Sequence, residues 1–412
     1  MTTLRGNVKW LLRNFERLVM RPTVLPTPWW MWPAAAYTVS DPRGVVVIFT
    51  PWNFPIALSL EPLAGALLTG NSVVLKLSES SPHLSRALAR MLPRYVDPSC
   101  LRVVLGGAAV SRALVEQPVD FVFFTGGNGV GAAIAESCGR RLIPFVLELG
   151  GKCPVVVFPD ADMTAVARRV AQGRFFNAGQ LCVSGDYVLV VGDEARRDEV
   201  VRAVSAEVRR QLGRDARASP DYSRIVNAAQ FDRLVEMIPS ADRKPCAGEC
   251  SCAVAHGGAH DRAALYVEPT LLTLDAAHAS RCRAMRGEIF GPVLPFMAVP
   301  DAAAAAAVIR SRAKPLQVYV FTRSRGNADY LMRRTQSSCF TVNDVLMGIA
   351  NYNAPFGTCG FGAYHGPHTF TCFAHVKPVT ETSVLVDSEY RYPPKLGSKA
   401  GLAGLKLFDW VL

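Results

Sequence analysis

Short apolar runs alternate with amphipathic segments along the first third of the chain. Apolar runs of four to six residues without polar alternation are typical of strands that are buried on both faces of a parallel sheet. The segments between them have the spacing of amphipathic helices. The pattern predicts strands at 44–49, 72–77, 101–105 and 121–124, and helices at 60–69, 83–92 and 109–116. Strand, helix and strand in this order predict a doubly wound α/β sheet.

A second set of elements begins after Glu148. Strands are predicted at 187–191, 291–298 and 318–321, and helices at 163–176, 196–212 and 302–307. The alanine-rich tract within this set is bounded by Asp301 and Arg310, which favours a helix over a linker. Because 412 residues exceed what one hydrophobic core usually organises, we expect two or three domains.

The two ends of the chain are amphipathic or apolar. Residues 1–21 predict one helix in which basic residues recur every fourth position, from Arg5 to Arg21. It could be a surface helix, a transit-like peptide or a membrane-surface helix, and Glu16 among the arginines favours the first. Residues 401–412 are apolar but too short to cross a bilayer, so they would dock on the protein, on a partner or at a membrane surface.

Charge and cysteine content narrow the class of protein. The net charge of +11 comes from scattered basic pairs, which argues against a nucleic-acid reader and stays compatible with an anionic cofactor or acidic lipid. Eleven irregularly spaced cysteines predict a reducing compartment, and we expect a cytoplasmic protein, with a mitochondrial or membrane-associated one as the alternative. Cys246, Cys250 and Cys252 with His256 and His260 match no zinc spacing, so we expect a surface loop and no metal.

Three polar residues stand where chemistry is possible. Cys182 lies between a glycine-containing loop and an apolar run, where a thiolate could be a nucleophile, although a lone cysteine is more often a small buried hydrophobe. Glu148 follows an apolar run and precedes Gly150 and Gly151, so its burial would raise its pKa toward that of a general base. Asn53 follows a predicted strand, at the end of a sheet where α/β proteins bind ligands.

Four short motifs that contain or neighbour these residues carry a resemblance to a known family, in which they occur in the same order. They are Pro51–Pro55 (PWNFP), Glu148–Lys152 (ELGGK), Phe175–Val190 with its central cysteine, and Glu288–Pro292 (EIFGP). Together they resemble the aldehyde dehydrogenase superfamily, and the resemblance runs from about residue 5 to about residue 395. The segments Gly362–Gly366 (GAYHG) and Arg391–Pro394 (RYPP) are similar to the class 3 branch, the fatty and aromatic aldehyde enzymes.

The resemblance implies the aldehyde dehydrogenase fold, with a doubly wound parallel-sheet cofactor domain, an α/β catalytic domain and a small β oligomerisation segment. The implied boundaries are 1–148 for the cofactor domain, 149–340 for the catalytic domain and 341–412 for a C-terminal bridging segment and tail. Residues 34–43 would contribute to the oligomerisation segment, and the branch implies a homodimer formed by pairing of edge strands.

The resemblance also implies a mechanism. Cys182 would attack an aldehyde to give a thiohemiacetal, whose oxyanion the Asn53 amide and the cysteine N–H would hold. After hydride departure, Glu148 would activate the water that hydrolyses the thioester. Lys152, Asn177, Asn343 and His365 match family positions with supporting roles.

Nine further residues match the family's cofactor positions. Lys76 and Glu79 would contact the adenosine ribose, a glycine-rich turn would face the phosphates, and Glu288 would bind the nicotinamide ribose. The matching residues are Lys76, Glu79, Thr125, Gly126, Gly131, Leu149, Gly150, Glu288 and Phe290. Because Glu79 would repel a 2'-phosphate, NAD is preferred and NADP remains possible.

The sequence leaves other functions open. An acylating relative that passes its thioester to an acceptor such as coenzyme A would not need Glu148. Gly127 stands where the family usually has Ser, and the first helices usual in the family are missing, which favours a second hypothesis: a catalytically silent dinucleotide-binding or structural member of the same fold. A third hypothesis, peripheral membrane contact, is compatible with an enzyme and with a catalytically silent protein.

Overall fold

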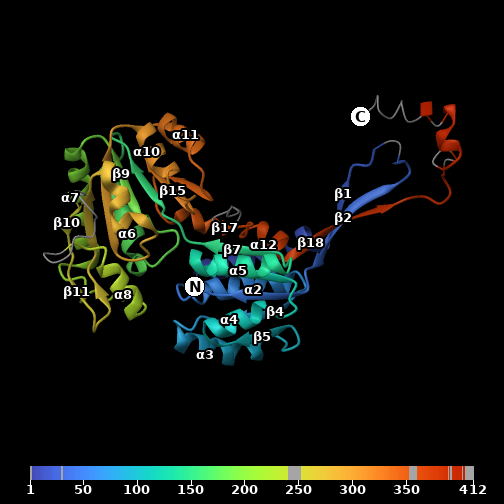
Figure 1. Ribbon diagram of the computed structural model, residues 1–412, viewed down its shortest axis with the longest axis horizontal. Coiled ribbons are helices and arrows are strands. Elements are labelled where there is room, and N and C mark those ends of the chain that lie inside the picture. Colours follow the sequence, from blue (N-terminus) through green and yellow to red (C-terminus); the bar gives the residue numbers. More distant parts are fainter. Residues whose placement is uncertain are drawn as a thin grey trace.

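Three β-sheets organise the chain in the computed structural model. The structure describes residues 2–28, 31–239, 252–351, 360–387, 389, 392–400 and 402–403. Figure 1 shows two α/β bodies side by side and a narrow β arm that extends away from them. The α/β fold class predicted from the alternating pattern is confirmed.

The first α/β body is built on a six-stranded sheet in the order β17-β7-β6-β3-β4-β5, with β17 antiparallel to β7 and the other strands parallel. Its strands are β3 Val45–Phe49, β4 Ser72–Lys76, β5 Leu101–Val104, β6 Phe121–Gly126, β7 Phe145–Leu149 and β17 Gly360–Phe361. Its helices are α1 Thr2–Phe15, α2 Ala57–Leu68, α3 Pro82–Met91, α4 Ala108–Val115, α5 Asn128–Arg140 and α12 His368–Phe373, with a π-helix at Glu16–Met20 and a 3₁₀ helix at Leu92–Arg94.

Alternate residues of these strands enter two different cores. On β3, Ile48 joins the core under α2, α3 and α12, whereas Val47 joins the core under α4 and α5. On β7, Val146 belongs to the first of these cores and Leu147 to the second. Because side chains alternate along a strand, Glu148 lies on the same face as Val146.

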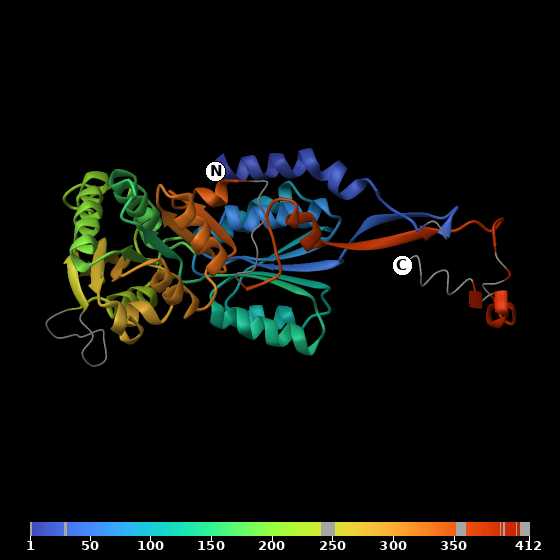
Figure 2. The same ribbon diagram turned by 90° about the horizontal axis from the view of Figure 1, so that it is seen from above.

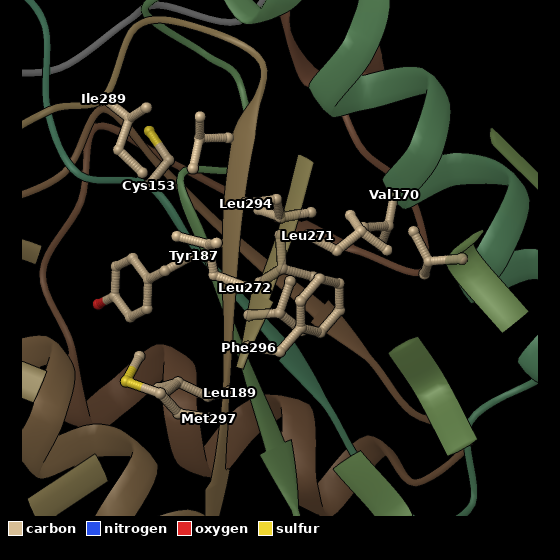
Figure 3. Close-up of a cluster of buried hydrophobic side chains, with 14 of the residues drawn as sticks. Cys153, Val170, Tyr187, Leu189, Leu271, Leu272, Ile289, Leu294, Phe296 and Met297 are labelled. Atoms are coloured by element: carbon tan, nitrogen blue, oxygen red, sulfur yellow. The ribbon is translucent and has the colours of Figure 1, made fainter. Parts of the chain in front are cut away.

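The second α/β body has a seven-stranded sheet in the order β10-β13-β14-β9-β8-β15-β16, parallel except for β10. Its strands are β8 Pro154–Val157, β9 Tyr187–Val191, β10 Cys252–His256, β13 Thr270–Leu274, β14 Val293–Val299, β15 Gln317–Phe321 and β16 Cys339–Val342, with a small hairpin of β11 His260–Asp261 and β12 Tyr266–Val267. Its α-helices are α6 Met163–Phe175, α7 Glu194–Leu212, α8 Ala228–Val235, α9 Arg283–Arg286, α10 Ala302–Arg310 and α11 Arg325–Arg334. Its 3₁₀ helices are Phe176–Gly179, Ala276–Arg281 and Met347–Ala350. Figure 3 shows side chains such as Leu272 and Phe296 of the strands in one buried cluster with Val170 of α6.

The arm is an antiparallel sheet in the order β1-β2-β18. Its strands are β1 Thr23–Leu25, β2 Ala35–Pro42 and β18 Ala374–Glu381, and a 3₁₀ turn follows at Lys395–Gly397. Figure 2 shows β18 running outward beside the N-terminal strands. The arm therefore joins two segments that are more than 300 residues apart in sequence.

Three predictions differ from the structure. The surface loop expected around Cys252, His256 and His260 is wrong for these residues, because Cys252–His256 forms the edge strand β10 and His260 begins β11. The helix predicted at 60–69 begins at Ala57, with Pro62 in its interior. The helix predicted over residues 1–21 is α-helical only to Phe15 and continues as a π-helix to Met20. No described helix is both long enough and apolar enough to cross a bilayer.

Candidate active site

A cavity of about 1130 Å³ lies between the two α/β bodies and gathers most of the polar residues singled out in the sequence. Its lining includes Asn53, Lys76, Glu79, Thr125, Gly126, Glu148, Leu149, Gly150, Cys182, Glu288 and Phe290. Gly131 does not line it. That glycine lies on α5, where a Cβ would come within 2.7 Å of a Leu149 methyl, so it allows close packing of the helix on β7.

Cys182 follows a turn with an unusual backbone. Asn177, Ala178 and Gly179 all have positive φ, of 50°, 52° and 73°. A Cβ at Gly179 would lie 2.3 Å from the Gly291 carbonyl oxygen, so this turn sits directly against the segment that carries Glu288. The thiol of Cys182 is partly buried and lines the cavity.

Asn53 lies against the same turn. Its side chain is buried, and its Nδ2 donates to the Gln180 carbonyl oxygen at 3.3 Å. Gln180 is held in turn by the backbone oxygens of Asn177 and Arg224. This hydrogen bond holds the Asn53 amide against the backbone of Gln180, which lies two residues before Cys182 in the sequence.

Glu148 reaches the cavity from the carboxyl end of strand β7. Burial raises the pKa of its carboxyl group to about 8. A carboxylate with such a pKa can take a proton from water near neutral pH.

Glu288 approaches the cavity from the opposite body. Burial first, and then the charge of Asp186, raise the pKa of Glu288 to about 8. Among the described residues, its buried Oε1 has no hydrogen-bond partner. Its Oε2 lies 1.9 Å from the position that a Cβ of Gly150 would occupy, so the carboxylate rests on the backbone of the strand that carries Glu148.

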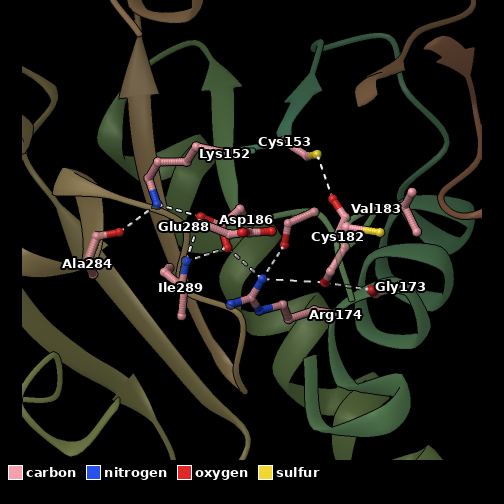
Figure 4. Close-up of polar contacts among 12 residues, drawn as sticks. Lys152, Cys153, Gly173, Arg174, Cys182, Val183, Asp186, Ala284, Glu288 and Ile289 are labelled. Carbon is pink, nitrogen blue, oxygen red and sulfur yellow. Dashed lines mark hydrogen bonds and ion pairs between the residues drawn. The ribbon is translucent and has the colours of Figure 1, made fainter. Parts of the chain in front are cut away.

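A buried ionic cluster supports Glu288 and the turn of Cys182 (Figure 4). Asp186 accepts from Lys152 Nζ at 2.6 Å, from an Arg174 nitrogen at 3.0 Å and from the Ile289 backbone N–H. Lys152 also donates to the carbonyl oxygens of Ala284 and Gly287. The cluster therefore ties together α6, the start of β9 and the segment before β14.

The far end of the cavity has groups suited to a dinucleotide. Lys76 is buried and its Nζ lies 2.7 Å from Glu79 Oε2, so both side chains are ordered where ribose hydroxyls could bind. Gly127 precedes α5, and a Cβ at Gly127 or Gly129 would meet nothing within 4 Å, so an anion has room at this helix N-terminus. The residues present thus fit a nicotinamide dinucleotide.

Several lining residues were not predicted from the sequence. Arg112, Glu116, Arg140 and Arg233 also line the cavity, and their only sequence signal is an ordinary charge on a helix. Asp186 had a clearer signal, because an acidic residue before the apolar run of β9 needs a buried counter-charge.

The remaining predicted residues lie elsewhere. Asn343 bonds to the backbone of Thr322, and His365 contacts Glu61 at 3.4 Å. Cys246, Cys250 and Arg391 lie outside the described residues. Where the chain is described, no group of three His, Cys, Asp or Glu residues could hold a metal ion.

Comparison with known proteins agrees with this geometry. Residues 5–379 match the model of the Aldehyde dehydrogenase family. The chain is 39% identical to Aldehyde dehydrogenase family 3 member H1 of Arabidopsis thaliana, over 98% of this chain and 83% of the relative. It is 35% identical to 4,4'-diaponeurosporen-aldehyde dehydrogenase of Staphylococcus aureus, over 90% of this chain and 78% of the relative.

Solved structures show the same fold. A substrate-bound Staphylococcus aureus AldH superposes with a TM-score of 0.90 at 33% identity, over 99% of this chain and 86% of that one. An indole-3-acetaldehyde dehydrogenase complexed with NAD+ superposes with a TM-score of 0.81 at 26% identity, over 92% of this chain and 76% of that one. The chain therefore belongs to the aldehyde dehydrogenase family, the NAD(P)-dependent oxidoreductases that convert aldehydes to carboxylic acids.

Proposed function

We propose that Cys182 is the nucleophile, Asn53 the oxyanion donor and Glu148 the general base of an aldehyde dehydrogenase that acts on medium- or long-chain aliphatic or aromatic aldehydes. The observation that carries this proposal is the convergence of all three side chains on one cavity with the groups suited to a dinucleotide. The retained Glu148 disfavours transfer of the acyl group to coenzyme A.

The three residues divide the chemistry among them. Cys182 Sγ attacks the carbonyl carbon to form a thiohemiacetal, and the Asn53 amide hydrogen-bonds the oxyanion that develops. A bound NAD+ or NADP+ supplies the hydride acceptor. Glu148 then takes a proton from water, which attacks the thioester carbon, and the carboxylic acid leaves as the Cys182 thiolate is restored.

Eight of the nine predicted dinucleotide residues keep their roles in this proposal, and Gly131, which does not line the cavity, instead packs α5 on β7. Lys76 and Glu79 would bind the adenosine ribose, and Thr125 and Gly126 precede the turn that would face the phosphates. Glu288 and Phe290, with Leu149 and Gly150, would hold the nicotinamide ribose. The buried Oε1 of Glu288, without a partner among the described residues, is an acceptor ready for a ribose hydroxyl. We favour NAD over NADP because Glu79 lies where it would repel a 2'-phosphate.

The substrate class follows from the aromatic surroundings of the site. Trp52 and Phe290 pack edge to face at 5.4 Å, and both line the cavity beside Asn53. Phe54 stacks on Phe176, next to the turn of Cys182. Apolar rings around the nucleophile favour apolar aldehydes over small hydrophilic ones.

Dinucleotide reduction with a panel of hexanal, decanal and benzaldehyde tests this proposal. We expect the absorbance of reduced nicotinamide to rise with wild-type protein and to stay flat with Cys182→Ala, which should still bind the dinucleotide by fluorescence. Glu148→Gln should give one burst of reduced dinucleotide and then stall. Steady turnover by Glu148→Gln would remove the base assignment.

The second candidate is a catalytically silent member of the fold. It is favoured by Gly127, which lacks the hydroxyl usual at the phosphate-facing turn. Absence of both dinucleotide reduction and dinucleotide binding would support it, whereas Cys182-dependent reduction would exclude it.

We also propose the domain roles, a homodimer and a cytoplasmic location. Residues 1–148 would be the cofactor domain, 149–340 the catalytic domain, and 341–412 the bridging segment and tail. The arm of β1, β2 and β18, whose strand β2 lies within residues 34–43, would supply the dimer contact. Membrane contact through the first helix or through residues 401–412 is testable by vesicle flotation of the full chain and of a chain ending at residue 400.

A further inference from the structure

A second buried carboxyl group lies behind the sheet that carries Glu148. Glu61, on α2, contacts Asn7 of α1 through its Oε1, and the same oxygen lies 3.4 Å from His365 Nε2. The Glu61 side chain is 14% exposed and that of His365 is 5% exposed, so the pair lies just below the surface under α1. The aldehyde oxidation assigned to the cavity uses neither residue.

Two buried hydroxyl groups, those of Tyr364 and Thr369, belong to the same side of the sheet as Glu61. Tyr364 and Thr369 are 6% and 0% exposed, and neither hydroxyl makes a hydrogen bond of normal geometry with any described residue. Thr369 lies on the Glu61 side, because its methyl group would be 2.3 Å from a Cβ of Gly65, one helical turn after Glu61. Thr369 nevertheless lowers the pKa of Tyr364 through a side-chain hydrogen bond, so the two hydroxyls are close to each other. Buried hydroxyls with no other partner are uncommon and call for an explanation.

The sheet geometry directs Tyr364 toward Glu148. Its ring packs edge to face on Phe123 at 4.8 Å, and Phe123 pairs in register with Val146 on β7. Glu148 lies two residues further along β7, on the same face as Val146. In addition, β17 pairs Gly360 with Glu148, so the chain that leads to Tyr364 starts beside that carboxyl group.

The electrostatics agree with this placement. Burial has the largest effect on the pKa of Tyr364 and raises it. The charges of Glu61, Cys372 and Glu148 raise this pKa further, whereas the side-chain hydrogen bond with Thr369 lowers it. Burial raises the pKa of Glu61 to about 7, against the opposing hydrogen bond of Asn7, and that of Glu148 to about 8. The titratable groups around Glu61 and Tyr364 are thus Glu148, His365 and the buried thiol of Cys372, whose pKa is raised by burial.

We propose that Tyr364 and Thr369, with the Glu61–His365 pair, form a proton route from Glu148 to the surface under α1. The proposal rests on the proposed function, in which Glu148 gains one proton from water in each turnover. That proton must leave before the next water can be activated. Glu148 lines the cavity that would hold the dinucleotide, so a bound dinucleotide would stand between Glu148 and the cavity mouth, whereas the route behind the sheet would stay open.

Each transfer conserves protons. Glu148 gives its proton to the Tyr364 oxygen, and the Tyr364 hydroxyl gives its own proton onward through Thr369 to the Glu61 carboxylate, from which it passes to solvent or to His365. A hydroxyl suits this role because it can accept one proton while it donates another. Tyr364, Thr369, Glu61 and His365 never touch the aldehyde, so they are positioned to affect only the hydrolytic half of the reaction.

The test compares Tyr364→Phe and Glu61→Gln with wild type over many turnovers, with aldehyde in excess and weak buffer, because the proton must leave only before the second water is activated. Two phases are followed: the initial burst of reduced dinucleotide, and the steady formation of the carboxylic acid. A relay contributes less than the roughly 10²–10⁴-fold of a general base, so we expect steady acid formation to slow about tenfold in both variants while the burst is unchanged. Added imidazole, which can carry protons itself, should restore much of the rate.

A matched control separates this effect from a packing defect. Tyr222→Phe also removes a buried tyrosine hydroxyl, which donates to the Val267 carbonyl oxygen in the other α/β body, and it should leave both phases unchanged. Wild-type acid formation by Tyr364→Phe or Glu61→Gln would overturn the route, and so would a loss of both phases that imidazole does not restore. If Glu148→Gln itself forms acid at the wild-type rate, the proposed base is wrong, whatever the other variants do.

Discussion

Burial sets the protonation of Glu148, the residue proposed to activate water. Its pKa of about 8 means that the carboxylate is the minor form at neutral pH and becomes the major form above pH 8. Only the carboxylate can accept a proton from water. A pKa near the working pH combines sufficient basicity with a usable population of the basic form.

Acid formation by the wild-type protein should therefore rise with pH and level off above about pH 8, because deprotonation of Glu148 creates the base. The burst of reduced dinucleotide should not follow this curve, since Glu148 has no part in thiol attack. Single-turnover measurements from about pH 6 to 9 check both phases. Equal rates of acid formation across that range would contradict the assignment.

Gly150 controls the position of Glu288. A methyl group there would lie 1.9 Å from Glu288 Oε2, so Gly150→Ala must displace the carboxylate or the strand end. Overpacking of this kind costs about 1–3 kcal/mol, and if the whole cost falls on binding, dinucleotide affinity drops by about 5- to 150-fold. Fluorescence titration measures the change.

The control is Gly139→Ala on α5, where a Cβ would meet nothing within 4 Å. This variant should bind the dinucleotide as wild type does. Equal affinity of Gly150→Ala and wild type would mean that Glu288 does not bind the ribose from its observed position.

At the scale of elements, strands β3 to β6 of the first α/β body and β9 of the second were predictable, and the ionic cluster was not. Buried parallel strands such as β3 and β9 are continuous apolar runs, which the sequence shows directly. The partners of Asp186 come from α6, from Lys152 and from the segment at Ile289, and no local pattern relates them. Cys182 and Glu148 were identified by motif resemblance, because burial pattern alone does not separate a nucleophile from a packed cysteine.

Asp186→Asn should strongly destabilise the protein. It leaves the buried cations Lys152 and Arg174 without their shared counter-charge, and removing one partner of a buried ion pair costs about 3–5 kcal/mol. Urea unfolding should show a lower midpoint for this variant. The substitution also loosens the support of Glu288 and of the turn before Cys182, so dinucleotide binding should weaken as well.

Asp232→Asn is the comparison variant, because Asp232 and Arg262 form an ion pair at the surface, with both side chains more than half exposed. Solvent screens such pairs, so its unfolding midpoint should stay close to that of wild type. A similar small change in Asp186→Asn would show that the cluster does not stabilise the fold.

For the whole molecule, the alternating pattern predicted the fold class, and the family resemblance implied a small β segment at residues 34–43, but the sequence did not show which strands pair with that segment. The pairing of β2 with β18 joins residues 35–42 to residues 374–381, and a contact over such a separation leaves no periodic signal. The arm also carries little core of its own. Val24 is 82% exposed on β1 and Val376 is 47% exposed on β18. Val24 pairs with Tyr37 and Val376 pairs with Ser40, three residues apart on β2, so the two valines lie on opposite faces of the arm. Exposed apolar side chains on both faces favour a partner surface for the arm.

In the proposed homodimer, the second copy would supply that surface. A charged side chain on the arm should therefore abolish the homodimer. Val24→Lys and Val376→Lys each place an ammonium group where an apolar contact with the second copy is expected, and burying an unpaired charge is strongly unfavourable. Light scattering after gel filtration should give twice the 44.7 kDa chain mass for wild type and the single mass for both variants. Leu142→Lys is the control, because Leu142 is 90% exposed on the first α/β body rather than on the arm, and this variant should remain dimeric. If both arm variants keep the wild-type mass, the arm is not the dimer contact.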